Sequence, residues 1–171
     1  MKIEGIKTER LNLRNYEKTD VDFIISIWND PEMGKYMPDP SMENMDEEYR
    51  KVYETLEEDE ECCYLISECL VTGEHIGTCS FVASEDGSTY DLGYCVHMKF
   101  WRNGYGTEMV QGMIDYAKSR GAKTITAPVS KKNEASNAIM RKLGFDITGE
   151  SKFKKMGTDI IMESYLYSLE L

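Results

Sequence analysis

The sequence predicts a mixed α/β fold in which helices cover one β-sheet. Short alternating or β-branched runs, typical of strands, are interspersed with longer segments that repeat apolar residues at helical spacing. Three strand-like runs follow one another with only short turns between them, which favours an antiparallel meander. A later strand–helix–strand segment predicts one parallel crossover. The chain has 171 residues, so we expect a single domain over residues 1–171.

The first half of the chain is expected to hold one strand and two helices. Thr19 is a candidate helix cap, and Asn29–Pro31 is a typical stop, because the residue before a proline avoids helical geometry. The expected elements are a strand at 6–14, a helix from 19 to 28, a loop at 31–42 and a helix at 44–59.

The second half is expected to hold most of the sheet. Turns around Gly73 and Gly87 separate the strands of the meander, and Gly121 and Gly144 are typical helix ends. The expected elements are strands at 63–70, 75–83 and 89–96, a helix at 107–120, a strand at 123–129, a helix at 133–142, and closing strands at 145–154 and 159–169.

The most informative segment is the glycine-rich turn Phe100–Thr107, between a predicted strand and a predicted helix. Gly104 and Gly106 let the backbone turn tightly and lie directly against a ligand. The helix start that follows offers free N–H groups and the positive end of the helix dipole. This combination favours a phosphate group, so a ligand with a pyrophosphate is the first hypothesis.

Two common phosphate-binding motifs do not fit this turn. A Walker A loop needs a Lys-Ser/Thr pair after its last glycine, and none is present. A dinucleotide fingerprint needs a small residue where Met109 stands, and an acid after the next strand, Ile125–Val129. Neither condition is met, so a nucleotide-dependent oxidoreductase is disfavoured.

The charge distribution of the chain further limits the classes of ligand that it could bind. The net charge is −11, yet nine basic and only three acidic residues fall between Met98 and Phe145, around the glycine turn. A small polyanion suits this distribution better than nucleic acid, which the acidic remainder would repel. His75 and His97 lack companions at ligand spacing, so we expect no metal site. No apolar run could span a membrane and Met1–Gly5 lacks a signal-peptide core, which predicts a cytoplasmic protein.

Several motifs, in order, resemble the GNAT family of N-acetyltransferases. Trp101–Gly106 is similar to its acetyl-CoA signature, Gln/Arg-x-x-Gly-x-Gly/Ala, with Trp at the first position. Asn133–Ser136 and Lys142–Phe145 resemble a paired motif of the RimJ/RimL-like branch, which acetylates ribosomal proteins. Thr8–Arg14 and Asn29–Glu32 resemble the opening of that branch. The resemblance implies a mostly antiparallel sheet of about six or seven strands, with helices on both faces.

The resemblance also implies acetyl-CoA as co-substrate. Backbone N–H groups of the turn would hold the pyrophosphate, the strand near Val96 and Met98 would pair with the pantetheine arm, and Asn133 would bind that arm. The cofactor-binding residues implied in this way are Val96, Met98, Arg102, Asn103, Gly104, Tyr105, Gly106, Thr107 and Asn133.

The implied chemistry is direct attack of a primary amine on the acetyl thioester in a ternary complex. Many relatives use a tyrosine as general acid where this chain has Met140, and in the RimJ/RimL-like branch Ser136 is the substitute. Asp91 is the candidate general base, with His97 as a weaker alternative. Structural roles for Ser136 and Asp91, in a helix turn and on a strand surface, stay open.

The acceptor is the least determined part. Trp28, Tyr36 and Met37 are the candidate substrate-binding residues, although aromatic residues there could equally belong to the core. A peptide N-terminus and a small cationic amine are both open as acceptor, and many relatives form homodimers. A non-catalytic acyl-CoA-binding module is the alternative function, because Met140 leaves the usual acid position vacant.

Overall fold

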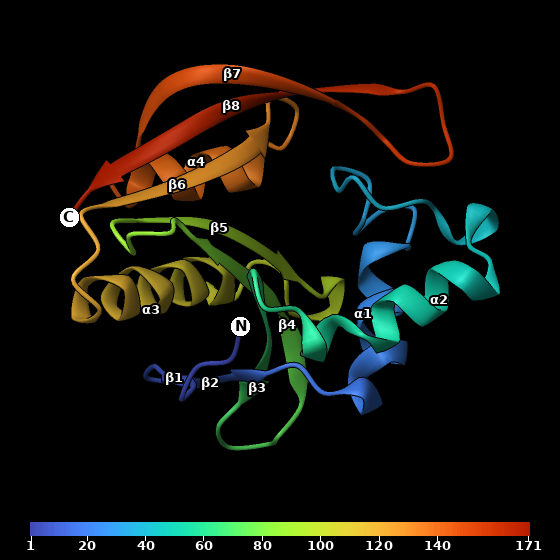
Figure 1. Ribbon diagram of the computed structural model, residues 1–171, viewed down its shortest axis with the longest axis horizontal. Helices are drawn as coiled ribbons and strands as arrows, with labels where there is room; N and C mark the ends of the chain where they lie inside the picture. Colours follow the sequence, from blue (N-terminus) through green and yellow to red (C-terminus); the bar gives the residue numbers. More distant parts are fainter.

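The computed structural model describes all of residues 1–171 as one eight-stranded sheet with four α-helices (Figure 1). The elements are β1 Ile6–Lys7, β2 Leu11–Asn15, α1 Val21–Trp28, α2 Glu47–Glu54, β3 Cys62–Cys69, β4 His75–Ala83, β5 Thr89–Val96, α3 Tyr105–Ser119, β6 Thr124–Ser130, α4 Glu134–Lys142, β7 Asp146–Lys154 and β8 Ile161–Glu170. Short 3₁₀ turns lie at Lys18–Asp20, Met42–Asn44, Leu56–Glu58 and Met98–Phe100.

The strands run in the order β1-β2-β3-β4-β5-β6-β8-β7. Every neighbouring pair is antiparallel except β5 and β6, which are joined by the predicted crossover through α3. The mixed, mostly antiparallel sheet is therefore confirmed, with one strand more than the upper expectation. No helix combines the length and the apolar composition that crossing a membrane requires.

Helices cover both faces of the sheet, because successive strand residues point to opposite sides. Leu65 belongs to the core that packs α3 and α4 on the sheet, whereas its neighbour Ile66 belongs to the core under α1 and α2. Burial of each such side chain contributes about 1.5–3 kcal/mol. The first core includes Phe81, Met109, Met113, Met140 and Tyr167, and the second includes Ile24, Ile27, Trp28 and Tyr53.

The extra strand arises because the predicted strand at 6–14 is broken. Thr8 N–H donates to the Leu11 carbonyl at 2.9 Å, and Leu11 N–H donates back to Thr8 Oγ1 at 3.0 Å. This tight turn reverses the chain, so that β1 and β2 pair with each other as an antiparallel hairpin. A polar side chain that bonds its own backbone competes with strand pairing, which the alternation of apolar residues does not reveal.

The predicted helix at 44–59 was too long. The Asp46 carboxylate accepts the Tyr49 N–H at 2.7 Å and caps α2, so the helix begins at Glu47. It ends before Thr55, and the acidic run that follows forms only a 3₁₀ turn at Leu56–Glu58. Negative charge is unfavourable at the C-terminal end of a helix, which accounts for the early stop.

Candidate active site

The defining feature of the site is an open edge on β5. The strands β5 and β6 pair only at Thr89, Tyr90 and Asp91 and then diverge, as Figure 1 shows, although β4 follows β5 as far as Val96. His97 N–H donates to the β4 side. Because strand groups alternate in direction, the N–H groups of Tyr94 and Val96 point to the open edge. The diverging strands thus leave backbone groups available to a ligand.

The helix α3 begins directly beside this edge with an unusual N-terminus. Gly104 occupies the N-cap position with φ +79°, and no side chain caps the helix. The N–H groups of Tyr105, Gly106 and Thr107 therefore lack an intrahelical partner. A Cβ on Gly106 would lie 3.1 Å from Ile139 Cδ1 and 3.3 Å from Tyr94 Cε2, so only glycine fits easily. The resulting cradle suits the anion that the sequence predicts.

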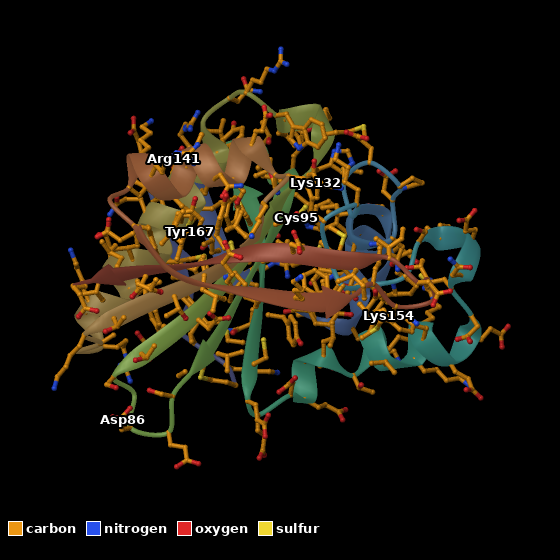
Figure 2. The ribbon with its side chains drawn as sticks, turned by 90° about the horizontal axis from the view of Figure 1, so that it is seen from above. Asp86, Cys95, Lys132, Arg141, Lys154 and Tyr167 are labelled. Carbon is orange, nitrogen blue, oxygen red and sulfur yellow. The ribbon has the colours of Figure 1, made fainter.

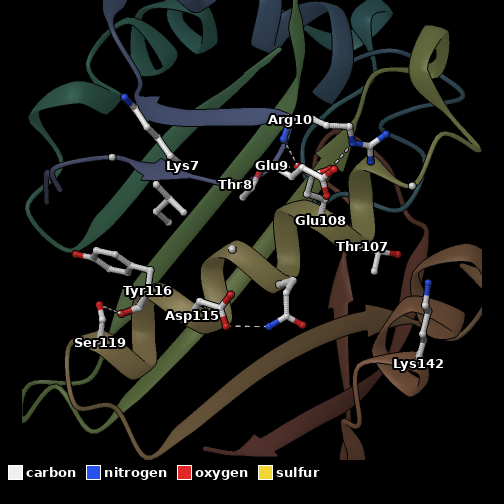
Figure 3. Close-up of a pocket in the computed structure, with 15 residues that line it drawn as sticks. Lys7, Thr8, Glu9, Arg10, Thr107, Glu108, Asp115, Tyr116, Ser119 and Lys142 are labelled. Carbon is white, nitrogen blue, oxygen red and sulfur yellow. Dashed lines mark hydrogen bonds and ion pairs between the residues drawn. The ribbon is translucent and has the colours of Figure 1, made fainter. Parts of the chain in front are cut away.

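An arginine that the sequence analysis did not single out fixes this cradle. Arg10 pairs with Glu108 (Figure 3), and its Nε lies 2.6 Å from Glu108 Oε2. Arg10 also donates to the Asn103 carbonyl at 3.0 Å and lies 4.4 Å from the centre of the Tyr105 ring. Burial opposes ionisation of Glu108, but hydrogen bonds from Thr8 and Arg10 outweigh it and hold the Glu108 pKa below its ordinary value. The Glu108 carboxylate is thus held by its ion pair with Arg10 and its hydrogen bond from Thr8.

A groove of about 870 Å³ runs along α3 beside the first hairpin (Figure 3). Arg10 and Glu108 lie in its wall, and Gly104 and Thr107 join it to the cradle. None of the predicted catalytic residues lines it. The groove therefore borders the donor end of the site and is separate from the place where the chemistry is expected.

Trp101 stands where the acetyl-CoA signature has Gln or Arg, and the structure gives it a role of its own. Its indole N–H donates to the Val96 carbonyl at 2.7 Å, which holds the end of β5 against the turn. By the alternation of strand groups, the Val96 N–H also points to the open edge of β5. The N–H of Met98, also predicted to face the cofactor, donates to Met33 Sδ at 3.1 Å, a weak acceptor. Asn103 and the exposed Arg102, with φ +63°, complete the turn.

Ser136 lies in the first turn of α4, opposite β5. The Asn133 side chain accepts the Ser136 N–H at 3.1 Å and caps the helix, which is a structural role beside the one predicted for Asn133. Ser136 Oγ lies 2.9 Å from the hydroxyl of Tyr94, a residue that the sequence analysis missed. Spacing could have indicated it, since Tyr94 stands two residues before Val96 and shares its face. Met140 is fully buried in the core.

Asp91 lies where β5 and β6 begin to diverge. Its carboxylate accepts the Thr126 hydroxyl at 2.5 Å, and burial raises the Asp91 pKa above its ordinary value. Asp91 and Tyr94 are three residues apart and point to opposite faces of the sheet, so Asp91 does not contact the Tyr94–Ser136 pair. His97, the weaker candidate, accepts the Lys99 N–H through Nδ1 at 3.2 Å.

Residues 10–146 match the acetyltransferase (GNAT) domain family. The chain belongs to the GNAT family. It is 28% identical to p20 of Bacillus licheniformis, an uncharacterized N-acetyltransferase, over 98% of this chain and 96% of that protein. The class of enzyme expected from the sequence, an N-acetyltransferase, is confirmed.

Solved GNAT structures share the fold. A GNAT acetyltransferase from Bacillus anthracis has a TM-score of 0.80 and 23% identity, covering 97% of this chain and 98% of that one. RimL, a ribosomal L7/L12 alpha-N-protein acetyltransferase, has a TM-score of 0.80 and 20% identity, covering 98% and 94%. The yncA structure from Salmonella typhimurium, described with its cofactor acetyl-CoA, has a TM-score of 0.70 and 22% identity, covering 95% of each chain.

In this GNAT protein the residues predicted to bind the acceptor substrate do not lie together: one is in the core and another is in a loop. Trp28 is buried in the core, and its indole N–H donates to Thr78 Oγ1 at 3.0 Å. Tyr36 lies in the loop after α1, and its hydroxyl donates to the Lys132 carbonyl at 2.9 Å. Figure 2 shows Lys132 and Cys95 toward the same end of the molecule, with Asp86 at the opposite end. Tyr36 thus joins the loop after α1 to the segment that leads into α4.

A buried lysine fastens the same loop from the other side. Lys155, in the turn between β7 and β8, donates through Nζ to the carbonyls of Gly34 and Met37, each at 2.9 Å. Burial lowers the Lys155 pKa, and the nearby Asp39 carboxylate opposes that effect. The Met37 backbone is therefore engaged, and the loop is held between the β7–β8 hairpin and α4. Sequence spacing gave no indication of Lys155.

Proposed function

We propose that this GNAT protein transfers the acetyl group of acetyl-CoA to a primary amine by direct attack in a ternary complex. The observation that carries the proposal is the open edge of β5 beside the uncapped start of α3. The first offers extended backbone to the amide groups of a pantetheine arm, and the second offers N–H groups to a pyrophosphate. Few ligands combine an anion and a chain of amides in that order.

The chain's own groups account for donor binding. The turn from Arg102 to Thr107 supplies N–H donors to the pyrophosphate, and the Val96 N–H supplies a strand-like contact to the pantetheine. Asn133 lies at the start of α4, across from this strand, and is the expected further contact to the arm. Acetyl-CoA, when bound, supplies the reactive thioester. Its presence in the yncA structure supports this choice of donor.

Catalysis requires a base, an acid and a stabiliser of negative charge. An acceptor amine is mostly protonated at neutral pH, so it must lose a proton before attack. Asp91 is the proposed base, and its raised pKa brings it nearer to the operating pH. Ser136 is the proposed donor of a proton to the departing sulfur. Free N–H groups on β5 are suited to stabilise the charge that develops on the carbonyl oxygen.

A protein or peptide N-terminus is the acceptor we favour. RimL is named as an alpha-N-protein acetyltransferase of ribosomal L7/L12, and a Vibrio fischeri relative is named for ribosomal protein S5 alanine. Both support a RimJ/RimL-like role here. The net charge of −11 also favours a cationic acceptor, including a small amine. Cytoplasmic location and a homodimer stay predictions.

The decisive test has two stages. Acetyl-CoA is expected to raise the melting temperature of the protein, whereas NADH is not, because the cradle lacks the features of a dinucleotide site. A thiol-release assay with N-terminal peptides and small amines then separates an enzyme from a binding module. Asp91→Asn serves as the variant expected to bind acetyl-CoA but to release little CoA.

Each stage can fail on its own. Equal stabilisation by acetyl-CoA and NADH, or none by either, would overturn the cradle assignment. Stabilisation by acetyl-CoA without thiol release above background for any amine would favour the non-catalytic acyl-CoA-binding alternative. Full activity of Asp91→Asn between about pH 6 and 9 would remove Asp91 from the mechanism.

A further inference from the structure

Two hydroxyl groups meet across the space between β5 and α4. Tyr94 OH and Ser136 Oγ lie 2.9 Å apart, although the residues are 42 positions apart in the chain. Each hydroxyl carries one hydrogen, and only one of the two can lie in their mutual hydrogen bond. Neither oxygen has another partner in the structure. The pair therefore always leaves one O–H free for a third group.

Tyr94 is held in this position by its surroundings. One edge of its ring lies against Gly106, where a Cβ would come within 3.3 Å of Cε2. The start of α3 thus fixes the ring on one side, and Ser136 receives the hydroxyl on the other. Ser136 can receive it because the only hydrogen bond of its hydroxyl is the one to Tyr94. Tyr94 therefore connects the cradle to the first turn of α4.

We propose that Tyr94 is a positioning residue that orients Ser136 toward the leaving sulfur of CoA. This inference rests on the proposed function. Tyr94 donates its O–H to Ser136 Oγ, which leaves the Ser136 proton free to point along the open edge of β5 and polarises the Ser136 O–H bond. As the C–S bond breaks, its electron pair goes to sulfur and the Ser136 proton follows. The amine gives its first proton to Asp91 before attack. Its second proton is lost as the new C–N bond forms and restores the Ser136 hydroxyl, so the step balances.

The electrostatic surroundings of Tyr94 support a donor role. Burial raises the Tyr94 pKa to about 12, so the phenol stays protonated through neutral pH. The other titratable groups that act on it are Cys79 and Cys95, whose own pKa values burial raises, so both thiols stay neutral. Met140 is fully buried and offers no proton. The Tyr94–Ser136 pair is thus the source of a hydroxyl proton between β5 and α4.

The test compares Tyr94→Phe, Ser136→Ala and the double variant with Tyr90→Phe as the control. Tyr90 is buried four residues earlier on the same face of β5, and its hydroxyl makes no hydrogen bond. The first readout is kcat for thiol release. We expect a loss of about tenfold for Tyr94→Phe and about 100-fold for Ser136→Ala, with the KM for acetyl-CoA unchanged. The double variant should match Ser136→Ala, since Tyr94 acts through Ser136.

The second readout needs no turnover. The thiol of bound CoA is titrated by its thiolate absorbance in each variant. A hydroxyl that donates to sulfur stabilises the thiolate, so the bound thiol should titrate about 1 pH unit higher in Ser136→Ala, and about half as much higher in Tyr94→Phe. Tyr90→Phe should match the wild type. Thermal unfolding of every variant confirms that it folds.

The outcomes separate the two proposals. A protein that binds no CoA would overturn the proposed function, and the role of Tyr94 with it. If CoA binds but no amine is acetylated, only the enzymatic proposal fails, and the titration still decides whether Tyr94 acts on the sulfur through Ser136. If Tyr94→Phe titrates and turns over like Tyr90→Phe, or if its loss multiplies that of Ser136→Ala, the Tyr94 inference is wrong.

Discussion

The helices α3 and α4 both begin beside the open edge of β5, but only one of them is closed by its own sequence. In α4 the Asn133 side chain accepts the Ser136 N–H and caps the first turn. In α3 the N-cap is Gly104, and no side chain fills that place. An ordinary helix satisfies its first N–H groups, so an end left open beside a fixed, glycine-lined turn is suited to a ligand.

The acidic residues in the first turns of α3 and α4 differ in the same way as their caps. In α4 the first residue, Glu134, is exposed and makes no ion pair. In α3 the acid Glu108 is drawn sideways to Arg10 and Thr8, which leaves the end of the helix without a negative charge of its own. Helix stability alone would favour an acid there. The arrangement around α3 instead favours an anion from outside.

The largest expected effect comes from placing a negative charge at the start of α3, where it would compete with the pyrophosphate. Thr107→Glu places a carboxylate in the first turn, which favours the helix dipole but repels a pyrophosphate. We expect an affinity for acetyl-CoA at least about tenfold lower, without a lower melting temperature. Thr107→Gln is the matched control of the same shape and should bind nearly as the wild type does. Calorimetric titration and thermal unfolding at fixed ionic strength measure both quantities.

Added salt sharpens this test. The difference in affinity between the Glu and Gln variants should shrink as ionic strength rises, because salt screens the charge at this partly exposed site. If the two variants bind acetyl-CoA equally well at low salt, the pyrophosphate does not lie at the start of α3.

A smaller effect is expected from removing the side-chain cap at the start of α4. Asn133→Ala removes the cap and should lower the free energy of unfolding by about 1 kcal/mol, or the melting temperature by about 2–4 °C. Asn133→Asp keeps an acceptor for the Ser136 N–H and should unfold like the wild type. It lacks the amide donor, however. Weaker acetyl-CoA binding by Asn133→Asp would support a contact with the pantetheine, and unchanged binding would leave Asn133 as a cap alone.

The sequence predicted the fold where patterns were periodic and local. The meander, the crossover and the glycine turn follow from alternation, helical spacing and backbone freedom, and the structure contains all three. The predictions at 6–14 and 44–59 were wrong in extent, because the polar side chain of Thr8 breaks the strand, that of Asp46 sets a later start for α2, and the acidic run after Glu54 ends the helix early. Thr8 and Asp46 bond the backbone at those points, and such local competition does not alter hydrophobic periodicity.

Prediction of the site had a different limit. Gly104 and Ser136 lie in motifs, so their positions could be inferred from one stretch of sequence. Tyr94 and Arg10 act on partners 42 and 98 positions away, and only the folded chain shows those contacts. Lys155 contacts Gly34, in the loop after α1, across 121 positions. Residues that orient others through long-range hydrogen bonds carry no signature at fixed spacing.

The smallest expected effect concerns the pairing of Glu108 with Arg10 and Thr8. Its folded-state pKa is lowered, so its contribution to stability is present above the unfolded pKa of about 4.3 and is lost as the pH falls through the folded value. Glu108→Gln should lower the free energy of unfolding by about 0.5 kcal/mol at pH 7, since Arg10 is partly exposed. This deficit should shrink as the pH falls below about 4.3 and should disappear once the pH is below the lowered folded-state pKa of Glu108.

Glu134→Gln, in the corresponding turn of α4, is the matched control, and it should show no such pH dependence because Glu134 is exposed and unpaired. Denaturant unfolding at several pH values measures both differences. A deficit of equal size and pH dependence in the two variants would mean that Glu108 acts only through the helix dipole. In that case Arg10 would not be what keeps the charge of Glu108 away from the start of α3.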